Sequence, residues 1–390
     1  MPAPPSLSAN SYILMDFNSD RILVSSDPEK RVEPASITKL MTSYVVFHEL
    51  HEGNISLTDP VPVSEKAWRT EGSRMFIEPG MDVTLEQLIK GMVIQSGNDA
   101  SVALAEYLAG SEEAFAGLMN HYAQQLGMYN SHFMNATGLP HEQHYTTAHD
   151  VAILSQALIR DYPEYYKWYS EKEYSFNEIR QHNRNNLLWR DPAVDGLKTG
   201  HTAAAGYCLA SSAKRDGMRL ISVVLGSNSE STRVSESQTL LNYGFRFYET
   251  VQLYKSGQEL ASGRVWKGEA EQVKLGVDEE LFVTIPRGRY EDLDAQVVMR
   301  PELVAPLAMG EDIGSVVVSI GGEEIARRSL VALEAVEPAG FFGRSWDGMK
   351  MWFGGLFGGD DEDGDSDETE VEVINENADE PDGENGGENS

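Results

Sequence analysis

Apolar residues recur along the first 250 residues in patterns typical of both strands and helices. Segments with the character of β-strands lie at 12–17, 21–26, 203–213 and 218–225. Segments with apolar residues at helical spacing lie at 85–95, 99–108, 112–126 and 147–160. Strands on both sides of a helical middle predict an antiparallel sheet that carries a helical subdomain, which is an α+β fold.

The segment after Pro34 predicts a helix that is buried on most sides. Its apolar residues are Leu40, Met41, Tyr44, Val45, Phe47 and Leu50. Proline suits a first helical turn, so Ser36 is predicted at the N-terminus of this helix. Lys39 lies three residues later and shares a face with Ser36. A hydroxyl and an amine side by side in a desolvated, electropositive place can make a serine nucleophilic. By itself, however, Ser-x-x-Lys more often marks a helix cap followed by a surface lysine.

The pattern changes near Val251, where short alternating runs separated by glycine-rich turns begin. These runs lie at 273–277, 281–285, 295–299 and 315–320. They predict a small all-β, sandwich-like domain at 249–337, after a first domain at 1–248. We find no chemistry-bearing cluster in the second domain, so we expect it to serve as a stalk or a docking surface.

Two further segments are predicted beyond residue 337. One is a helix at 338–359 whose apolar residues, spaced by four, three, four and three positions, are Phe342, Trp346, Met349, Phe353 and Leu356. We expect its 341–358 portion to lie in a membrane interface, although docking on the protein's own core would use the same stripe. The other segment, 360–390, holds 15 acidic residues, no basic residue and few apolar ones, which predicts a disordered tail.

Charge and composition narrow the class of partner. The 390 residues carry a formal net charge of −31, and −16 remains when 360–390 is set aside. This acidity argues against nucleic acid as a partner. Cys208 is the single cysteine, so no internal disulfide is expected. The first residues lack the basic start and apolar run of a signal peptide, and no stretch has the roughly 20 apolar residues of a spanning helix. We therefore expect either a cytoplasmic protein or a mature exported form.

Two more short motifs favour a functional interpretation of Ser-x-x-Lys. Ser96-Gly97-Asn98 interrupts a helical region, and Lys198-Thr199-Gly200 stands just before the predicted strand at 203–213. Alone, the first would be a simple helix break, and the second a strand-entry turn with an exposed lysine. The three motifs occur in this order about 60 and about 100 residues apart, which makes coincidence a poor explanation.

With these motifs the sequence resembles the penicillin-recognising serine enzymes, whose fold is that of β-lactamases and transpeptidases. It is most similar to the low-molecular-weight D-alanyl-D-alanine carboxypeptidases of the penicillin-binding protein 5 and 6 type. The segments that carry this narrower resemblance are 35–46, 91–100, 183–189, 194–202 and 242–251. The resemblance is close over about residues 8–250, whereas the β-domain and the anchor match in layout rather than in residues.

The resemblance implies that Ser36 is the acylated nucleophile, Lys39 its general base and Ser96 a proton relay to the leaving amine. A lysine working near pH 7 needs its pKa lowered by about three units, which burial and a second cation both favour. The substrate-binding residues implied in the same way are Asn98, Lys198, Thr199, Gly200, His201 and Arg233.

Within that set, Asn98 would bind a substrate amide, and Lys198, Thr199 and Arg233 would hold the terminal carboxylate. The assignment of Arg233 depends only on its distance from Lys198 in the sequence. The alternative is that Arg233 is an ordinary surface arginine. The backbone N–H groups of Ser36 and His201 would form the oxyanion hole. No metal and no other cofactor is expected, because we see no His, Asp and Glu cluster with metal spacing.

The predicted activity is removal of the terminal D-Ala from peptidoglycan stem pentapeptides, with β-lactams as inhibitors. A role in peptidoglycan maturation and cell shape, at the periplasmic face of the bacterial inner membrane, follows from the same resemblance. Three alternatives remain open: an endopeptidase that cuts cross-links, a β-lactamase and a non-catalytic scaffold that binds cell-wall peptide. The absence of a Glu-x-x-Leu-Asn element disfavours fast β-lactam hydrolysis, and the intact motif residues disfavour the scaffold.

Overall fold

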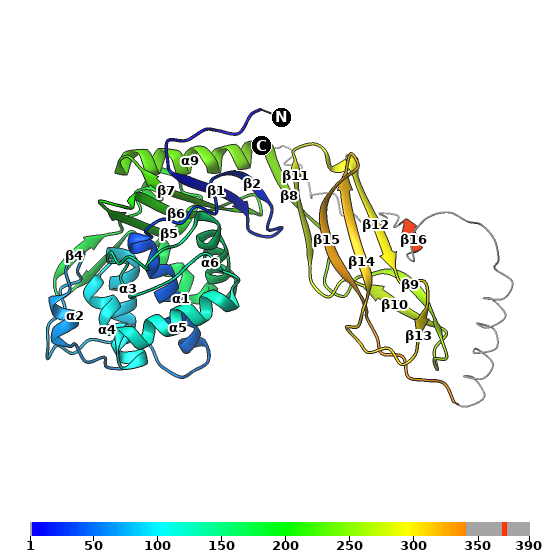
Figure 1. The fold of residues 1–390 in the computed structure, drawn as a ribbon, viewed down its shortest axis with the longest axis horizontal. Coiled ribbons are helices and arrows are strands. Elements are labelled where there is room, and N and C mark those ends of the chain that lie inside the picture. Colours follow the sequence, from blue (N-terminus) through cyan, green and yellow to red (C-terminus); the bar gives the residue numbers. More distant parts are fainter. Residues whose placement is uncertain (1, 341–368, 373–390) are drawn as a thin grey trace, which may run out of the picture. The chain divides into compact units, whose positions relative to one another are not determined.

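A computed structural model describes residues 2–340 and 369–372 (Figure 1). The chain divides into two compact units, Met1–Glu249 and Thr250–Ser390. The first unit combines helices with an antiparallel sheet, and the second unit consists of strands with a single short 3-10 helix, η3 (Tyr290–Asp292), among its described residues. The predicted α+β class, with a helical subdomain on the first sheet and a small all-β domain after it, is confirmed.

The main sheet of the first unit has five antiparallel strands in the order β2-β1-β7-β6-β5. Their bounds are β1 Ser11–Asp16, β2 Ile22–Ser26, β5 Val194–Thr202, β6 Gly206–Arg215 and β7 Met218–Ser227. A separate hairpin pairs β3 (Glu173–Phe176) with β4 (Ile179–His182). The four predicted strands are confirmed as β1, β2, β6 and β7, whereas β5 was not predicted. Because β5 has few apolar residues and is buried over most of its length, it shows no strand-like alternation.

Helices surround this sheet on both faces (Figure 1). The α-helices are α1 Lys39–His51, α2 Glu65–Arg69, α3 Leu85–Gln95, α4 Asn98–Ala109, α5 Glu112–Gln125, α6 Ala148–Asp161, α7 Pro163–Tyr166, α8 Leu187–Arg190 and α9 Glu230–Phe247. The 3-10 helices are η1 Ala35–Thr38 and η2 Lys167–Ser170. The predicted helices at α3, α4, α5 and α6 are confirmed. Helix α9 was not predicted, because its first turns are rich in serine and carry a weak apolar stripe.

Side chains alternate between the two faces of the sheet, and each face has its own core. Leu14 and Leu220 are buried with Leu240 of α9, which covers one face (Figure 1). Ile13 and Ile221 are buried in the core of the helical subdomain on the other face. Because neighbouring residues face opposite cores, a shift of one residue in register would move each set of side chains into the core that is packed for the other.

The segment that contains Ser36 differs from the prediction in one respect. The buried helix is present as α1, but it begins at Lys39, and Ala35–Thr38 form the 3-10 turn η1 before it. Ala35 has a φ of 47°, in the left-handed region, so a regular α-helix cannot extend back through this residue. Ser36 therefore lies in a tight turn at the start of a buried helix.

The second unit contains a seven-stranded sheet in the order β13-β9-β10-β15-β14-β12-β16 and a two-stranded sheet of β11 and β8. Their bounds are β8 Tyr248–Tyr254, β9 Glu259–Trp266, β10 Gln272–Gly276, β11 Leu281–Pro286, β12 Leu293–Met299, β13 Leu303–Val304, β14 Asp312–Ile320, β15 Glu323–Ala332 and β16 Thr369–Glu372. Buried residues from both sheets, including Val283, Val297 and Val316, form one apolar core.

The predicted anchor face at 341–358 lies outside the described residues. Within the tail that was predicted to be disordered, β16 pairs instead with β12 in an antiparallel ladder. The pairing has a physical reason, since β12 otherwise presents an unpaired row of backbone N–H and C=O groups at the sheet edge.

Candidate active site

The Ser-x-x-Lys motif brings a hydroxyl and an amine together. Lys39 is fully buried at the start of α1, and Ser36 is half-buried in η1. Lys39 Nζ donates hydrogen bonds to Ser36 Oγ at 3.1 Å, to Asn98 Oδ1 at 2.7 Å and to the Thr137 carbonyl oxygen at 2.6 Å. Acceptors from three segments thus fix the amine beside the serine.

Burial sets the protonation of this amine. Removal from water lowers the pKa of Lys39 to about 7, because a charged ammonium loses its hydration inside the protein. The negative charges of Asp99 and Glu112 oppose this shift. Near neutral pH a large share of Lys39 is therefore an unprotonated amine, which can accept a proton from Ser36.

The Ser-x-Asn motif lies in the turn between α3 and α4. Ser96 ends α3 with a φ of 68°, an unusual conformation for a residue other than glycine, and this turns the chain so that Asn98 begins α4. The Asn98 side chain accepts from Lys39 and donates from Nδ2 to the Glu71 carbonyl oxygen at 2.6 Å. Its backbone N–H donates to the Ser73 carbonyl oxygen at 2.7 Å. The loop after α2 thus holds the motif in place.

Asp99 binds the backbone of the same loop, the one after α2. Its fully buried carboxylate accepts backbone N–H bonds from Met75 at 3.0 Å, Phe76 at 2.9 Å and Ala100 at 2.9 Å. Bonds from N–H groups to an ionised acceptor are among the strongest in proteins. Asp99 therefore joins the loop to the start of α4 and positions Asn98, a function that motif spacing did not reveal.

The third motif lies within β5, at the edge of the sheet, rather than in a turn before a strand as the sequence predicts. Lys198 is buried, and its Nζ donates to Ser96 Oγ at 2.9 Å. Burial, together with the charges of Lys39, Arg184 and Arg233, holds the pKa of Lys198 well below its usual range. The edge position explains how β5 presents Lys198 toward the helical subdomain without disrupting the sheet.

Two glycines allow backbone segments to meet at η1. A Cβ on Gly138 would lie 1.8 Å from the Ala35 carbonyl oxygen, and its φ of 85° also disfavours other residues. A Cβ on Gly200 would lie 3.0 Å from the Pro34 carbonyl oxygen. The loop that contains Thr137 can approach η1 this closely only because Gly138 has no side chain, whereas a side chain at Gly200 would force β5 and η1 slightly apart.

Arg233 reaches the site from α9. Its guanidinium donates to the Gly200 carbonyl oxygen at 3.3 Å and lies 3.4 Å from the Glu230 carboxylate. Burial lowers the pKa of Arg233 somewhat, yet arginine remains charged near neutral pH. The exposed His201 ring lies against Tyr207, with ring centroids 4.1 Å apart. Arg233 is thus placed beside the third motif, and its alternative as an isolated surface residue is wrong.

The structure also adds groups that the motifs do not contain. The Thr137 and Glu71 carbonyl oxygens hold Lys39 and Asn98, and the exposed Arg184 is close enough to lower the pKa of both Lys198 and Arg233. The two carbonyl oxygens could not be identified from the sequence, because every residue type has a backbone carbonyl group. Arg184 lies in the family-like segment 183–189 but was not singled out there.

The residues of all three motifs therefore converge on one serine. Residues 1–229 match the family model described as D-alanyl-D-alanine carboxypeptidase, which spans more than half of the chain. The chain belongs to this family of carboxypeptidases. Residues 248–338 match the C-terminal domain of penicillin-binding protein 5. The resemblance and the class of enzyme that the sequence predicts are confirmed.

Several known proteins are similar to this carboxypeptidase over most of its length. D-alanyl-D-alanine carboxypeptidase DacA of Escherichia coli K12 is 46% identical over 366 residues, which cover 92% of this chain and 91% of DacA. The structure of penicillin-binding protein 5 from Haemophilus influenzae is 43% identical with a TM-score of 0.84 and covers 86% of this chain and 100% of that chain. Penicillin-binding protein D2 from Listeria monocytogenes, solved in an ampicillin-bound form, is 29% identical with a TM-score of 0.57, covering 62% of this chain and 100% of that one.

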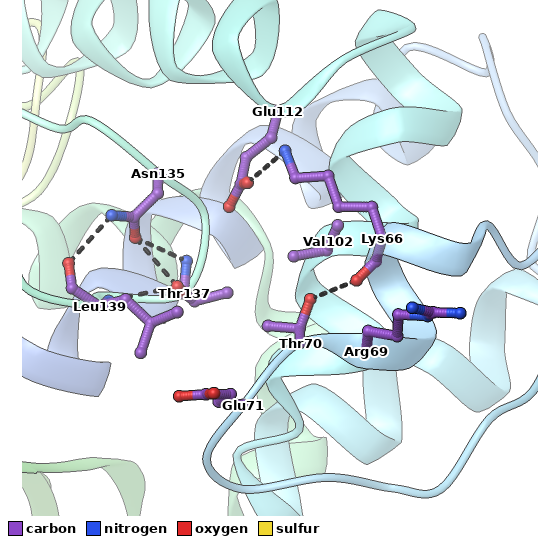
Figure 2. Close-up of a pocket in the computed structure, with 9 residues that line it drawn as sticks. All are labelled: Lys66, Arg69, Thr70, Glu71, Val102, Glu112, Asn135, Thr137 and Leu139. Atoms are coloured by element: carbon purple, nitrogen blue, oxygen red, sulfur yellow. Dashed lines mark hydrogen bonds and ion pairs between the residues drawn. The ribbon is translucent and has the colours of Figure 1, made fainter.

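This carboxypeptidase has a pocket of about 460 Å³ (Figure 2) that shares residues with the supports of the three-motif cluster. It is lined by Lys66, Arg69, Thr70, Glu71, Val102, Glu112, Asn135, Thr137 and Leu139. Two of these residues, Glu71 and Thr137, also supply the carbonyl oxygens that hold Asn98 and Lys39. The pocket and the cluster are therefore built on the same loops.

Two other features bear on the sequence predictions. Glu29, His149 and Asp150 place possible metal-ligand atoms within 4.8 Å of one another, a grouping that sequence spacing does not reveal. There His149 Nδ1 lies 2.9 Å from the Glu29 carboxylate, and Asp150 accepts from Ser131 Oγ at 2.7 Å. Among the described residues, no helix has the length and apolar content needed to span a membrane.

Proposed function

We propose that this protein is a serine D-alanyl-D-alanine carboxypeptidase that removes the terminal D-Ala from peptidoglycan stem pentapeptides. The observation that carries the proposal is the buried Lys39 amine, 3.1 Å from Ser36 Oγ and with a pKa of about 7. Such an amine is a general base matched to neutral pH, and a nucleophile with an adjacent base is the arrangement that acyl transfer requires.

In the acylation step, Ser36 Oγ attacks the carbonyl carbon between the two D-alanines while its proton passes to Lys39 Nζ. The backbone N–H groups of Ser36 and His201 stabilise the oxyanion of the tetrahedral intermediate. The C–N bond then breaks, and the proton that Lys39 took from Ser36 passes through Ser96 to the leaving amine, so that Lys39 is neutral again. Lys198 Nζ orients Ser96 Oγ at 2.9 Å. Water hydrolyses the resulting ester, with Lys39 again as base, and restores Ser36.

Substrate binding uses the remaining residues of the cluster. Asn98 binds a substrate amide, and Gly200 keeps β5 close to η1 so that the substrate backbone can lie beside the strand. Lys198, Thr199 and Arg233 hold the carboxylate of the terminal D-Ala. This assignment is supported by the burial of two basic side chains, Lys198 and Arg233, at this end of the cluster. β-Lactams acylate the same serine, which is supported by the ampicillin-bound relative in the same family.

The direct test is release of D-alanine from a peptide that ends in D-Ala-D-Ala, with wild type and Ser36→Ala measured side by side. We expect release by the wild type alone, and loss of labelling by a fluorescent penicillin in the variant. A thermal melt of both proteins serves as the folding control. Release by Ser36→Ala at the wild-type rate would refute the nucleophile. Cleavage of a cross-linked peptide without release from the linear one would favour the endopeptidase.

We further propose that the enzyme acts in peptidoglycan maturation and cell shape at the periplasmic face of the inner membrane, held there by 341–358. The aromatic stripe in the sequence supports this anchor, and the β-unit at 249–337 would then act as a stalk. Deletion of 341–358 is expected to release the protein from vesicles of phosphatidylethanolamine and phosphatidylglycerol in a co-sedimentation assay. Deletion of 373–390 is the matched control, and equal binding by both variants would contradict the anchor.

A further inference from the structure

The seven-stranded sheet of the second unit has two unlike edges. One edge is β13, a strand of only two residues, Leu303–Val304. The other end of the sheet is formed by β12 and the tail strand β16 (Figure 1). Without β16 the outermost strand there would be β12, which pairs with β14 in continuous register from Leu293 to Met299. The sheet therefore has one long edge on which a further strand can pair.

The strand β12 lacks the usual protection of an edge strand. Edge strands commonly carry lysine, proline or a bulge, each of which hinders pairing with another molecule. The sequence of β12, Leu-Asp-Ala-Gln-Val-Val-Met, has neither lysine nor proline, and its one charged residue is Asp294 near the first end. Its regular pairing with β14 leaves no bulge within β12. The unpaired backbone groups of such a long, apolar and regular strand would be a template for a strand of another molecule.

The tail strand β16 supplies the protection that β12 lacks. Its four residues, Thr369–Glu372, pair antiparallel with the β12 residues from Gln296 to Met299. The strand is short, two of its four residues are glutamates, and it belongs to the segment 360–390, which holds 15 acidic residues and no basic one. Short strands and charged residues both discourage further pairing at an edge. Addition of β16 thus replaces an unprotected edge with a protected one.

We infer that β12 is an interaction surface for a second copy of this chain, and that the tail strand β16 covers this surface and keeps the protein monomeric. The inference concerns the second unit alone and does not depend on the carboxypeptidase activity. It also gives a role to the segment 360–390, which lies outside both matched family models, since these cover residues 1–229 and 248–338.

The competition between the two occupants depends on protein concentration. Pairing of β16 with β12 is intramolecular and independent of concentration, whereas pairing between two copies requires their encounter. When β16 is displaced, two β12 strands pair antiparallel about a two-fold axis, which uses the same surface on both copies. The assembly stops at two copies, because the opposite edge of the sheet is the two-residue strand β13. The expected product is a dimer rather than a fibre.

The test places prolines in β16 of the full chain. Of two neighbouring residues in an antiparallel strand, one directs its N–H to the partner, and proline has no N–H to donate. The double substitution Glu370→Pro and Val371→Pro, called the β16 variant, therefore removes a bond from the ladder. The double substitution Glu376→Pro and Asn377→Pro is the matched control, because it adds two prolines and removes one acidic residue outside β16.

The measurement is the molar mass by light scattering after size-exclusion chromatography, at protein concentrations from about 1 µM to about 1 mM. Wild type and the control should stay monomeric, and the β16 variant should double its molar mass as the concentration rises. Deletion of 360–390 should give the same dimer. Deletion of 373–390 should not, since it removes acidic residues but retains β16. All of these proteins keep 341–358, so any association through that segment is common to them.

A lysine in β12 locates the interface. Val298 is half-buried and lies opposite Ser315 of β14, on the face of the sheet away from the buried Val297. Val298→Lys therefore adds an edge lysine without placing a charge in the core. Combined with the β16 variant, it should restore the monomer, because lysine at an edge hinders strand pairing. Thermal melts of all variants serve as the folding control.

Three results would overturn the inference. The first is a β16 variant that stays monomeric over the whole concentration range. The second is an equal dimer in the proline control or in the 373–390 deletion, which would assign the effect to acidic charge rather than to β16. The third is a dimer that Val298→Lys leaves intact, since its interface would lie away from β12.

Hydrogen exchange of the β12 amides gives a second measurement that needs no dimer. At the lowest concentration these amides should exchange faster in the β16 variant than in wild type, because local protection depends on backbone hydrogen bonds that exclude water. Exchange in the proline control should match wild type. Equal exchange in wild type and the β16 variant would show that β16 does not cover this edge, and the inference would be wrong.

Discussion

The pH dependence of catalysis follows from the burial of Lys39. An ordinary lysine pKa of 10.5 would leave only about three amines in 10,000 neutral at pH 7, whereas a pKa of about 7 leaves half of them neutral. The shift corresponds to about 5 kcal/mol of differential interaction between the two protonation states. Only the neutral amine accepts the Ser36 proton, so kcat/KM should rise with pH to a plateau above about pH 8. It should fall roughly ten-fold per unit below pH 6, because kcat/KM reports the free enzyme.

The assay is kcat/KM for D-alanine release between pH 5 and pH 9, in a buffer series of constant ionic strength. Glu112→Gln removes a negative charge that raises the pKa of Lys39, so the acidic limb should move to lower pH. The glutamine side chain of this variant can still accept the Ala136 N–H bond, and the exposed Glu113→Gln is the matched control. An acidic limb centred near pH 10, or one that stays in place in Glu112→Gln and moves in Glu113→Gln, would refute this account.

The same pKa shift makes a prediction about stability. The pKa of Lys39 is lower in the folded protein than in the unfolded chain, so between about pH 7 and pH 10.5 the unfolded chain binds the extra proton. This group therefore destabilises the fold most below pH 7, and the cost declines as the pH rises toward 10.5. In urea unfolding, the stability of Lys39→Met relative to wild type should be greater at pH 6 than at pH 9. A difference that does not change with pH would contradict a lowered pKa.

Three further substitutions test the supports of the site. Asp99 accepts several buried backbone N–H bonds, so Asp99→Asn should lower the free energy of unfolding in urea by about 2–4 kcal/mol and should lower kcat. An unchanged unfolding midpoint would contradict this role of Asp99. Gly138→Ala places a Cβ 1.8 Å from the Ala35 carbonyl oxygen, so the melting temperature and the rate of penicillin acylation should both fall. Gly117 has open space around it, so Gly117→Ala is the control and should leave the acylation rate near wild type. Arg233→Gln should lower kcat/KM by about 10- to 100-fold for D-Ala-D-Ala peptides. It should have less effect on an analogue whose terminal carboxylate is amidated, and equal losses for both substrates would exclude carboxylate binding by Arg233.

The sequence by itself determined much of the local structure. Helices α3 to α6 show apolar residues at a period that local backbone geometry imposes, so their positions could be predicted without tertiary information. The strand β5 could not be predicted in this way. It is nearly buried and holds polar motif residues, so its pairing with β6 replaces the missing alternation. Likewise, α1 begins later than predicted, since Ala35 has a φ of 47° in a turn against which Gly138 and Gly200 pack closely.

For the site, the sequence determined which residue types stand in which order, and this was enough to indicate the family. Only the tertiary structure decided their chemistry. The pKa of Lys39 depends on burial by surrounding segments, and the amine is held by a carbonyl oxygen 98 positions away in the chain. The pocket beside it also combines residues from separate segments, 66–71, 112 and 135–139. Backbone acceptors and desolvation cannot be predicted from residue types, since any residue can supply a carbonyl oxygen and any packed neighbour can exclude water.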